Sequence, residues 1–322
     1  MKELWSKLRN YKAGNIVIVF VVVQIAFITA SLLYPRQFAY MSTSSIQTLL
    51  KSLAPIAILA TGAGILMIAG EFDLSVGSNF AFTAYIMAIV YQCNYPAWLA
   101  VAVALGLGAL IGLINGLITL KAKIPSFIAT LGALMFWRGM LQIVSGGQTE
   151  SMQPGGFFES VFAGNLGPIQ AQFIWAIAIA FAGYLLLERH KLGNHIFGVG
   201  GNVNSARAIG VYPNTVKMIC FIIVGILAAF AGVISTARVH SVSPDQGRGY
   251  ELQAIAACVI GGVSLAGGEG SVLGLFLGAT LLFTIQNVLL LLRAPGSYLD
   301  MFMGILIVVA VIFNRLTKKD KS

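Results

Sequence analysis

The residue types that most often perform catalysis are few in this chain, and they do not form a site by their spacing. The three histidines, His190, His195 and His240, lack the spacing of metal ligands. No Gly-Lys pair occurs, so a phosphate-binding P-loop is absent, and no Gly-x-Ser-x-Gly nucleophile motif is found. We therefore predict that this chain has no catalytic site, no metal site and no ATP site of its own.

Charged residues that could bind a coupling ion are also rare inside the apolar segments. Ion-coupled transporters place ionisable side chains there, although each charge at a helix centre costs about 2.5–3.5 kcal/mol. Arg138 is the main exception, and it could pair with a carboxylate or extend toward the surface. Other charged residues lie at segment ends: Lys51, Glu71, Asp73, Glu251, Glu269 and Asp300. This distribution weakens a proton or sodium mechanism and favours energy supplied by another subunit.

The loop 188–217 contains the residues best suited to contact another protein. Asn202 or Asn204 can cap a short helix, Gly210 can end it in the left-handed conformation, and Pro213 suits the first turn of the next helix. The short helix has small side chains that would fit a cleft in a partner, and Arg207 could pair with a carboxylate there. An ordinary connecting loop is the alternative interpretation.

The composition indicates which kind of protein carries these residues. Of 322 residues, 58% are hydrophobic and only 10% are charged, and the mean hydropathy is +0.87. Soluble domains are about 25% charged, so both a soluble enzyme and a disordered chain are excluded. The three cysteines, Cys93, Cys220 and Cys258, are scattered and predict no disulfide framework. A polytopic membrane protein remains.

Ten apolar segments are long enough, or nearly so, to span a bilayer. They are 14–34, 48–69, 78–92, 97–120, 124–145, 169–187, 216–237, 253–266, 270–292 and 299–315. The segments 78–92 and 253–266 are short, and each lies beside a glycine-rich break, at 70–77 and 261–270. Such breaks often mark the pathway of a transporter. The predicted fold is all-α, a single transmembrane domain over 1–322 with about ten transmembrane helices, some short or broken.

The positions of the basic residues predict the orientation. Fourteen of the 20 Lys and Arg residues fall in four clusters beside apolar segments. With the N-terminus inside, all four clusters lie on the cytoplasmic side and only four arginines lie on the other, as the positive-inside rule requires. Both termini are then cytoplasmic, and the largest outside loops are 146–168 and 238–252. This pattern also explains the net charge of +9 without a nucleic-acid partner.

Glycines recur every fourth residue in two of the segments, which allows helix backbones to approach closely in lipid. They are Gly108, Gly112 and Gly116 in one segment, and Gly270, Gly274 and Gly278 in the other. Packing within one subunit and a subunit interface are both compatible with this spacing.

Three motifs give a resemblance to a known family. The first combines Gly200-Gly201-Asn202, Ala206-Arg207 and Gly210. The second is the Asp-Leu-Ser-Val-Gly-Ser run within 70–78, and the third is the long stretch 249–270. Together they resemble the permease subunits of bacterial ABC importers for monosaccharides, which include ribose, xylose, arabinose, galactose and autoinducer-2 systems. The resemblance covers nearly the whole chain, in order; Glu71-Phe72 departs from the residues many members carry there.

The resemblance implies partners and residue roles. Such permeases pair as homodimers or as two related chains in the bacterial inner membrane. An ABC ATPase that binds ATP and Mg²⁺ docks on the cytoplasmic face, and an extracytoplasmic sugar-binding protein docks outside. The residues expected to contact the ATPase are Gly200, Gly201, Asn202, Ser205, Ala206, Arg207, Gly210 and Val211. Those expected to face the binding protein are Asp245, Arg248 and Glu251, for which a merely solvated loop is the alternative.

A neutral sugar needs hydroxyl partners along its path rather than charges. Polar residues within the apolar segments are candidates: Asn79, Asn115, Ser126, Gln142, Gln286 and Asn287. Each could equally form a hydrogen bond between helices. Asp73 and Ser75 belong to a matched motif at a break, and they could line a gate or cap a helix. We therefore predict the translocation subunit of an ATP-driven importer for a monosaccharide or similar small polyol; an ion-coupled secondary transporter of a small neutral solute is the alternative.

Overall fold

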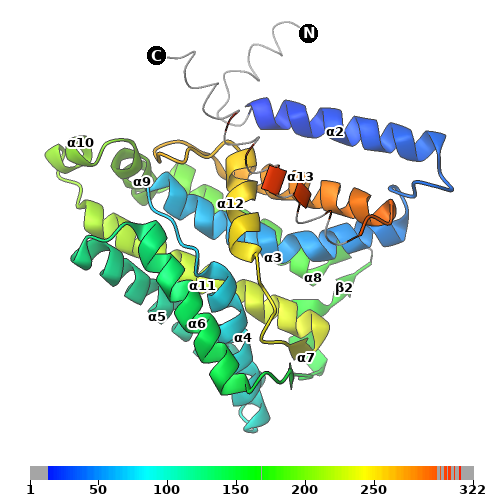
Figure 1. The fold of residues 1–322 in the computed structure, drawn as a ribbon, viewed down its shortest axis with the longest axis horizontal. Coiled ribbons are helices and arrows are strands. Elements are labelled where there is room, and N and C mark those ends of the chain that lie inside the picture. Colours follow the sequence, from blue (N-terminus) through cyan, green and yellow to red (C-terminus); the bar gives the residue numbers. More distant parts are fainter. Residues whose placement is uncertain are drawn as a thin grey trace, which may run out of the picture.

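The computed structural model describes residues 14–167 and 169–295, together with residues 298, 301, 302, 304, 305, 308 and 312. Regular structure in these residues is almost entirely helical (Figure 1). The long helices are α2 (Gly14–Leu33), α3 (Thr43–Ile68), α4 (Val76–Gln92), α5 (Ala97–Ala122), α6 (Ser126–Ser145), α8 (Ala171–Tyr184), α11 (Pro213–Val239) and α13 (Val272–Leu291). The shorter ones are α7 (Gly156–Ala163), the π-helical η1 (Leu185–Arg189), α9 (Lys191–Gly201), α10 (Val203–Ala208) and α12 (Tyr250–Ile260).

Among the described residues, seven helices are long and apolar enough to cross a membrane: α2, α3, α5, α6, α8 with η1, α11 and α13. Nine of the ten predicted segments overlap with helices, which confirms a mostly helical, multi-span protein for this part of the chain. The helix in the segment predicted at 253–266 ends early, at Ile260, because the chain turns at Gly262, whose φ is +85°. Most of the segment 299–315 and both terminal basic clusters lie outside the described residues.

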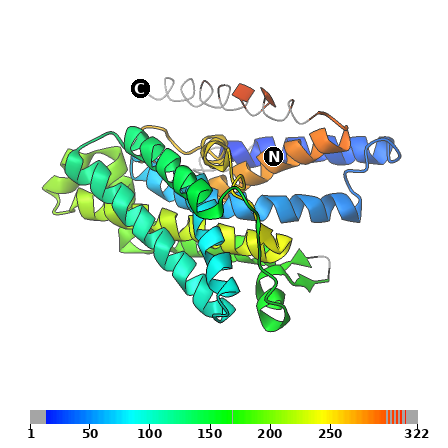
Figure 2. The same cartoon turned by 60° about the horizontal axis from the view of Figure 1, so that its bottom comes forward.

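Helix α11 joins two groups of helices (Figures 1 and 2). On one side α3 and α13 contact each other and α2 lies along α13; on the other, α4, α5 and α6 contact one another. Helix α11 contacts α3, α4 and α5, and most of its residues are buried. The core of the protein therefore lies along α3 and α11 rather than at the lipid-facing helices.

The spaced glycines pack helices within one subunit. A Cβ atom on Gly112 of α5 would lie 2.2 Å from the carbonyl oxygen of Phe221 in α11, and one on Gly108 would lie 2.5 Å from that of Gly225. In the same way, a Cβ on Gly278 of α13 would lie 2.1 Å from the carbonyl oxygen of Ala257 in α12. The packing interpretation is thus confirmed, because the two backbones touch where only hydrogen fits.

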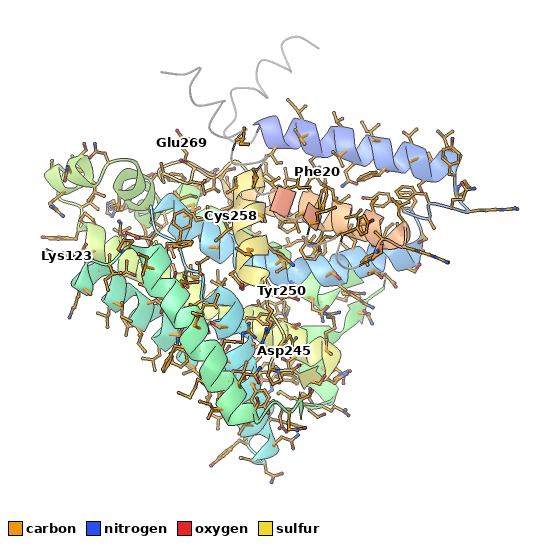
Figure 3. All side chains as sticks on the ribbon, viewed as in Figure 1. Phe20, Lys123, Asp245, Tyr250, Cys258 and Glu269 are labelled. Atoms are coloured by element: carbon orange, nitrogen blue, oxygen red, sulfur yellow. The ribbon has the colours of Figure 1, made fainter. Side chains whose placement is uncertain are left out.

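Two ends of the protein matter for the sites described below, and Figure 3 helps to locate them. At the α10 end lie α9, α10, Lys123 and Glu269. At the β4 end, the strand β1 (Glu150–Ser151) pairs antiparallel with β4 (Ser241–Val242), so the predicted outside loops 146–168 and 238–252 are joined. The first of these loops also contains α7 and a small hairpin of β2 (Asn165–Leu166) and β3 (Ile169–Gln170).

Candidate functional site

The first glycine-rich break is an extended segment that runs between α3 and α4. Because residues 71–75 are not helical, their backbone amides need other partners in an apolar interior. Helix α6 supplies them: Phe72 N donates to Ser126 Oγ over 3.0 Å, and Leu74 N donates to Thr130 Oγ1 over 3.0 Å. Ser126 therefore has a hydrogen-bonding role between segments in this structure.

The break begins near the α10 end and ends deep in the protein. Glu71 Oε1 lies 2.6 Å from Lys217 Nζ in the first turns of α11, and both side chains are 14% exposed. At the other end of the break, the carbonyl oxygen of Gly77, at the start of α4, accepts a hydrogen bond from Arg138, which lies in the second half of α6. The distance along α6 from Ser126 to Arg138 is about 18 Å at 1.5 Å per residue. Helix α4 is thus short because the extended segment, rather than helix, spans the first part of the distance along α6.

A buried polar cluster of three residues lies where α4 begins. Asp73 is 4% exposed, and its Oδ1 accepts hydrogen bonds from Ser75 N (2.7 Å) and Ser75 Oγ (2.6 Å). Asn115 Nδ2 of α5 donates to Asp73 Oδ2 (3.2 Å) and to Ser75 Oγ (2.8 Å). The Ser75 hydroxyl is directed to Asp73 and makes no capping bond to α4. The cluster therefore ties the end of the first break to α5 through the Asp73 carboxylate.

The two other candidate pathway asparagines form hydrogen bonds between elements. Asn79 Nδ2 donates to the carbonyl oxygen of Gly225 in α11 over 3.2 Å, and its Oδ1 is buried without a partner among the described residues. Asn287 Nδ2 of α13 donates to Ser45 Oγ of α3 over 2.8 Å. The five predicted pathway residues therefore form two groups: Asn287 lies apart, toward the end of α13, and the others gather around the start of α4.

The second break connects α12 to α13 and lies against the end of α3. Gly268 N donates a hydrogen bond to the carbonyl oxygen of Ile68 over 2.9 Å. Ser271 then caps α13, because its hydroxyl accepts from Gly274 N over 3.1 Å. Both breaks consequently meet at one place, the C-terminal end of α3.

Helix α9 packs against this same place. A Cβ atom on Gly200 would lie 1.8 Å from the carbonyl oxygen of Ile68 and 2.7 Å from Gly268 N, and one on Gly267 would lie 2.9 Å from the Cα of Gly70. We call these residues, Ile68, Gly70, Gly200, Gly267 and Gly268, the glycine junction. Three backbones touch in it: the end of α3, the end of α9 and the second break. Gly200, predicted to contact an ATPase, lies in this internal contact and is half-buried.

The predicted short helix after Asn202 is α10. Asn202 caps it, because its Oδ1 accepts a hydrogen bond from Ser205 N over 3.0 Å; Gly210 follows with φ +84°, and Pro213 begins α11. The sequence analysis did not anticipate that α9 makes most of the preceding loop helical. The glycine pair within 198–201 and the absence of a strong apolar run obscured that helix.

The surface that α10 presents differs in part from the predicted one. Five of the eight predicted contact residues are exposed: Gly201, Asn202, Ser205, Arg207 and Gly210. Ala206 and Val211 are 3% and 8% exposed, so they pack inward in this chain. Two apolar residues that the sequence analysis missed, Ile209 and Tyr212, are 80% and 79% exposed at the tip. Two large apolar side chains on either side of Gly210 in a polar loop were the sequence feature that could have indicated an exposed contact surface.

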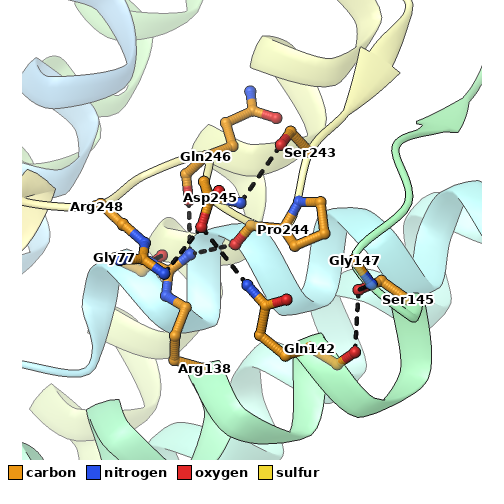
Figure 4. A network of polar contacts seen from close by, with 10 residues as sticks. All are labelled: Gly77, Arg138, Gln142, Ser145, Gly147, Ser243, Pro244, Asp245, Gln246 and Arg248. Atoms are coloured by element: carbon orange, nitrogen blue, oxygen red, sulfur yellow. Dashed lines mark hydrogen bonds and ion pairs between the residues drawn. The ribbon is translucent and has the colours of Figure 1, made fainter.

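At the β4 end, Arg138 has a structural role: its side chain bonds backbone carbonyl oxygens and forms no ion pair with a described carboxylate. Its guanidinium donates to the carbonyl oxygens of Pro244 (2.8 Å), Gln246 (2.9 Å) and Gly77 (3.3 Å), as Figure 4 shows. The chain that turns between β4 and α12 leaves its carbonyls unpaired by secondary structure, and the planar fork of arginine satisfies them. Arg138 thereby fastens the outer loop to the start of α4.

The three residues predicted to face a binding protein are placed differently from one another. Asp245 and Arg248 are exposed and form an ion pair of 2.8 Å (Figure 4). Glu251 is half-buried at the start of α12, where its Oε1 accepts from Gly249 N over 3.2 Å. Its Oε2 is buried and has no hydrogen-bond partner among the described residues, so this carboxylate is directed inward. Burial raises the pKa of the Glu251 carboxyl, and the hydrogen bond from Gly249 opposes that rise.

Clusters of side chains that bind metals are absent from the part of the chain that the structure describes. There, no group of three or more His, Cys, Asp or Glu side chains could hold a metal ion.

Comparison with known proteins places these features in a family. The family described as "Branched-chain amino acid transport system / permease component" matches residues 45–311. The ribose import permease protein RbsC of Escherichia coli K12 is 36% identical over 266 residues, which are 80% of this chain and 81% of that protein. RbsC of Haemophilus influenzae is 34% identical over 96% of this chain and 98% of its own length. The autoinducer 2 import system permease protein LsrC of Enterobacter sp. 638 is 34% identical over 86% of this chain and 81% of its own length. No solved structure matches.

Proposed function

The chain belongs to the family of permease components of branched-chain amino acid transport systems, and from this premise we propose that it imports a monosaccharide or a similar small polyol. It is a transmembrane translocation subunit, as its similarity to ribose and autoinducer 2 import permeases and its apolar helices show. The ribose and autoinducer 2 names of these relatives support a small polyhydroxylated substrate.

The energy comes, in this proposal, from a separate ABC ATPase that binds ATP and Mg²⁺ and docks on α10. The observation that carries this assignment is the connection from the α10 surface to both breaks. Exposed Ile209, Tyr212 and Arg207 offer an apolar tip with one positive charge. Directly before α10, α9 ends in the glycine junction, where Gly200 touches Ile68 and Gly268. A displacement of α10 by the ATPase would therefore reach both broken spans through backbone contacts.

The rest of the proposal concerns topology and the outer face. We infer one transmembrane domain over 1–322 with ten spans in the bacterial inner membrane, both termini cytoplasmic and the α10 end inside. A second permease chain, identical or related, completes the pathway. A sugar-binding protein docks on the β4 end, where Asp245 and Arg248 are exposed. Asp73, Ser75, Asn79 and Asn115 form the gate, since they connect the start of α4 to α5 and α11.

Isolation of the chain from native membranes in mild detergent tests this function. A co-purifying ATPase with Walker motifs, a co-purifying soluble binding protein, and ATP-dependent sugar uptake by the reconstituted complex are the expected results. Uptake by proteoliposomes that contain the chain alone, abolished by a protonophore, would instead establish ion-coupled transport and overturn the proposal.

A further inference from the structure

A cavity of about 230 Å³ lies among α3, α11, α12 and α13, and we propose that it is a binding site for a neutral polyhydroxylated solute. This inference rests on the proposed function and names a place where the imported solute binds the permease. Its volume is somewhat below the range of pockets for drug-sized ligands, which begins at about 300 Å³. It therefore suits a solute of monosaccharide size.

The cavity lies in the half of the protein near the β4 end. It is bordered by the first turns of α3 at Thr48 and Ser52, by the last turn of α11 at Arg238, by the first turn of α12 at Tyr250 and Gln253, and by the last turns of α13. Figure 3 shows Tyr250 near Asp245 in this view and closer to the centre of the protein. A solute released at the outer loops would thus meet this cavity early on its way inward.

Polar side chains without protein partners gather in this cavity. Arg238 Nε is buried and has no hydrogen-bond partner among the described residues. Besides Arg238, six residues that line the cavity carry hydrogen-bonding side chains: Thr48, Ser52, Tyr250, Gln253, Gln286 and Asn287. For Ser52, Tyr250 and Gln253, no side-chain hydrogen bond to another described residue is formed. A buried polar atom without a partner, such as Arg238 Nε, costs free energy. Ser52, Tyr250 and Gln253 are half-buried beside it, so a ligand or water in the cavity can complete the hydrogen bonds of all four.

The hydrogen-bonding groups that line the cavity indicate which kind of ligand fits it. Hydroxyl and amide side chains both donate and accept, which matches the hydroxyl groups of a sugar. Arg238 donates only, so it fits a carbonyl, ring or hydroxyl oxygen of the solute. Among the described lining residues it carries the only charge, and apolar Leu49 and Phe283 offer a surface for the carbon skeleton. The cavity is therefore built for an uncharged solute rich in oxygen atoms; a phosphorylated sugar is the competing ligand that the experiment must separate.

Labelling of an introduced thiol in the cavity tests binding independently of transport. In the Gln253→Cys variant, assembled with its ATPase and binding protein, a water-soluble sulfonatoethyl methanethiosulfonate labels the thiol at position 253 and the exposed native Cys93, while Cys220 and Cys258 are buried. We expect D-ribose, D-xylose or D-galactose at millimolar concentration to slow labelling at position 253 at least threefold and to leave Cys93 unchanged. No protection by any of the three sugars, or protection by D-ribose 5-phosphate alone, overturns the proposal.

Uptake by the reconstituted complex provides the second readout. Arg238→Met, which keeps the volume and removes the donors, should lower uptake of the protecting sugar about tenfold. The matched control is Arg36→Met, an exposed arginine in the connection between α2 and α3. Equal uptake by Arg238→Met and wild type contradicts the proposed role of Arg238. If the wild-type complex shows no ATP-dependent uptake while the introduced thiol at position 253 is still protected, the proposed function fails and the binding site stands.

Discussion

Gly200 of α9 lies directly against the carbonyl oxygen of Ile68 at the end of α3, with space at that contact for a hydrogen atom only. The same carbonyl accepts a hydrogen bond from Gly268 in the second break. Each of the two broken spans is therefore attached to α3, and α9 is attached to both. Because packed backbones move together rather than bend continuously, this contact can carry a displacement from α10 into the membrane domain.

Gly200→Ala tests this connection. The added methyl group would overlap Ile68 O and force α9 away from the glycine junction, and such overpacking costs about 1–3 kcal/mol of folding stability. We expect a lower melting temperature and loss of most ATP-dependent uptake. The measurements are thermal unfolding in detergent and uptake by the reconstituted complex.

The control for that variant is Gly198→Ala, in the same helix. A Cβ atom at Gly198 meets no other atom within 4 Å, and alanine favours the helix by about 1 kcal/mol over glycine. It should transport as wild type does, with unchanged or higher stability. Equal uptake by both variants would show that the close contact at Gly200 is irrelevant to coupling.

Arg207→Glu tests docking at α10. The side chain of Arg207 is exposed and makes no hydrogen bond or ion pair with another described residue, so reversal of its charge should leave the fold intact. We expect uptake to fall at least tenfold at normal membrane abundance, together with weaker co-purification of the ATPase. Lys191→Glu is the control, because Lys191 is exposed at the start of α9, away from the tip. Full retention of the ATPase by Arg207→Glu would contradict the docking role.

Asn115→Leu should destabilise the protein through the Asp73 cluster. The substitution removes both hydrogen bonds that Asn115 donates and leaves a buried carboxylate with fewer partners, which costs about 1–3 kcal/mol. Thr119→Val, one turn later in α5, is the matched control, since the buried Thr119 hydroxyl has no partner among the described residues. We expect a clear fall in melting temperature for the first variant and none for the second. Similar values for the two variants would mean that the cluster contributes little.

The Glu71–Lys217 pair offers a test of how the first break is held. Each side chain is only 14% exposed, so removal of one partner leaves a poorly solvated charge. Glu71→Gln and Lys217→Met should each lower the melting temperature, and the double variant should be more stable than the sum of the two losses predicts. A double-mutant cycle measures this coupling, for which we expect about 1 kcal/mol. If the two single losses of stability add up to that of the double variant, the contact contributes no coupling free energy.

The sequence predicts the helices well because lipid-exposed spans need continuous apolar residues, and within the part of the chain that the structure describes, nine of the ten segments overlap with helices. It also predicts both breaks, Asn202 as a cap and Gly210 as the end of α10, because these depend on local backbone preferences. What the breaks touch depends on tertiary packing. No local pattern places Gly200 against Ile68, or directs Arg138 to three carbonyl oxygens, since those partners lie far away in the chain.

In the candidate site too, the sequence shows local motifs, while the partners of their residues depend on tertiary packing. The motif around Asp73 and Ser75 stands out in the sequence, and the structure adds Asn115 from another helix as their partner. Burial separates residues that a motif groups together: Ala206 packs inward while its neighbour Arg207 is exposed. The cavity beside Arg238 draws its lining from four helices, and its residues have no common motif.

Arg138→Leu tests whether the outer loop must be fastened to α4. Loss of three hydrogen bonds should free residues 240–249, and the carbonyl oxygens of Pro244, Gln246 and Gly77 would lose their charged donor. We expect faster amide hydrogen exchange in that loop and loss of ATPase stimulation by the sugar-loaded binding protein. Gln142→Leu, one turn along α6, removes only a 3.5 Å contact with Asp245 and should retain both properties. Exchange that is unchanged in Arg138→Leu would show that β1–β4 pairing alone holds the loop, and that the three hydrogen bonds of Arg138 do not fasten it.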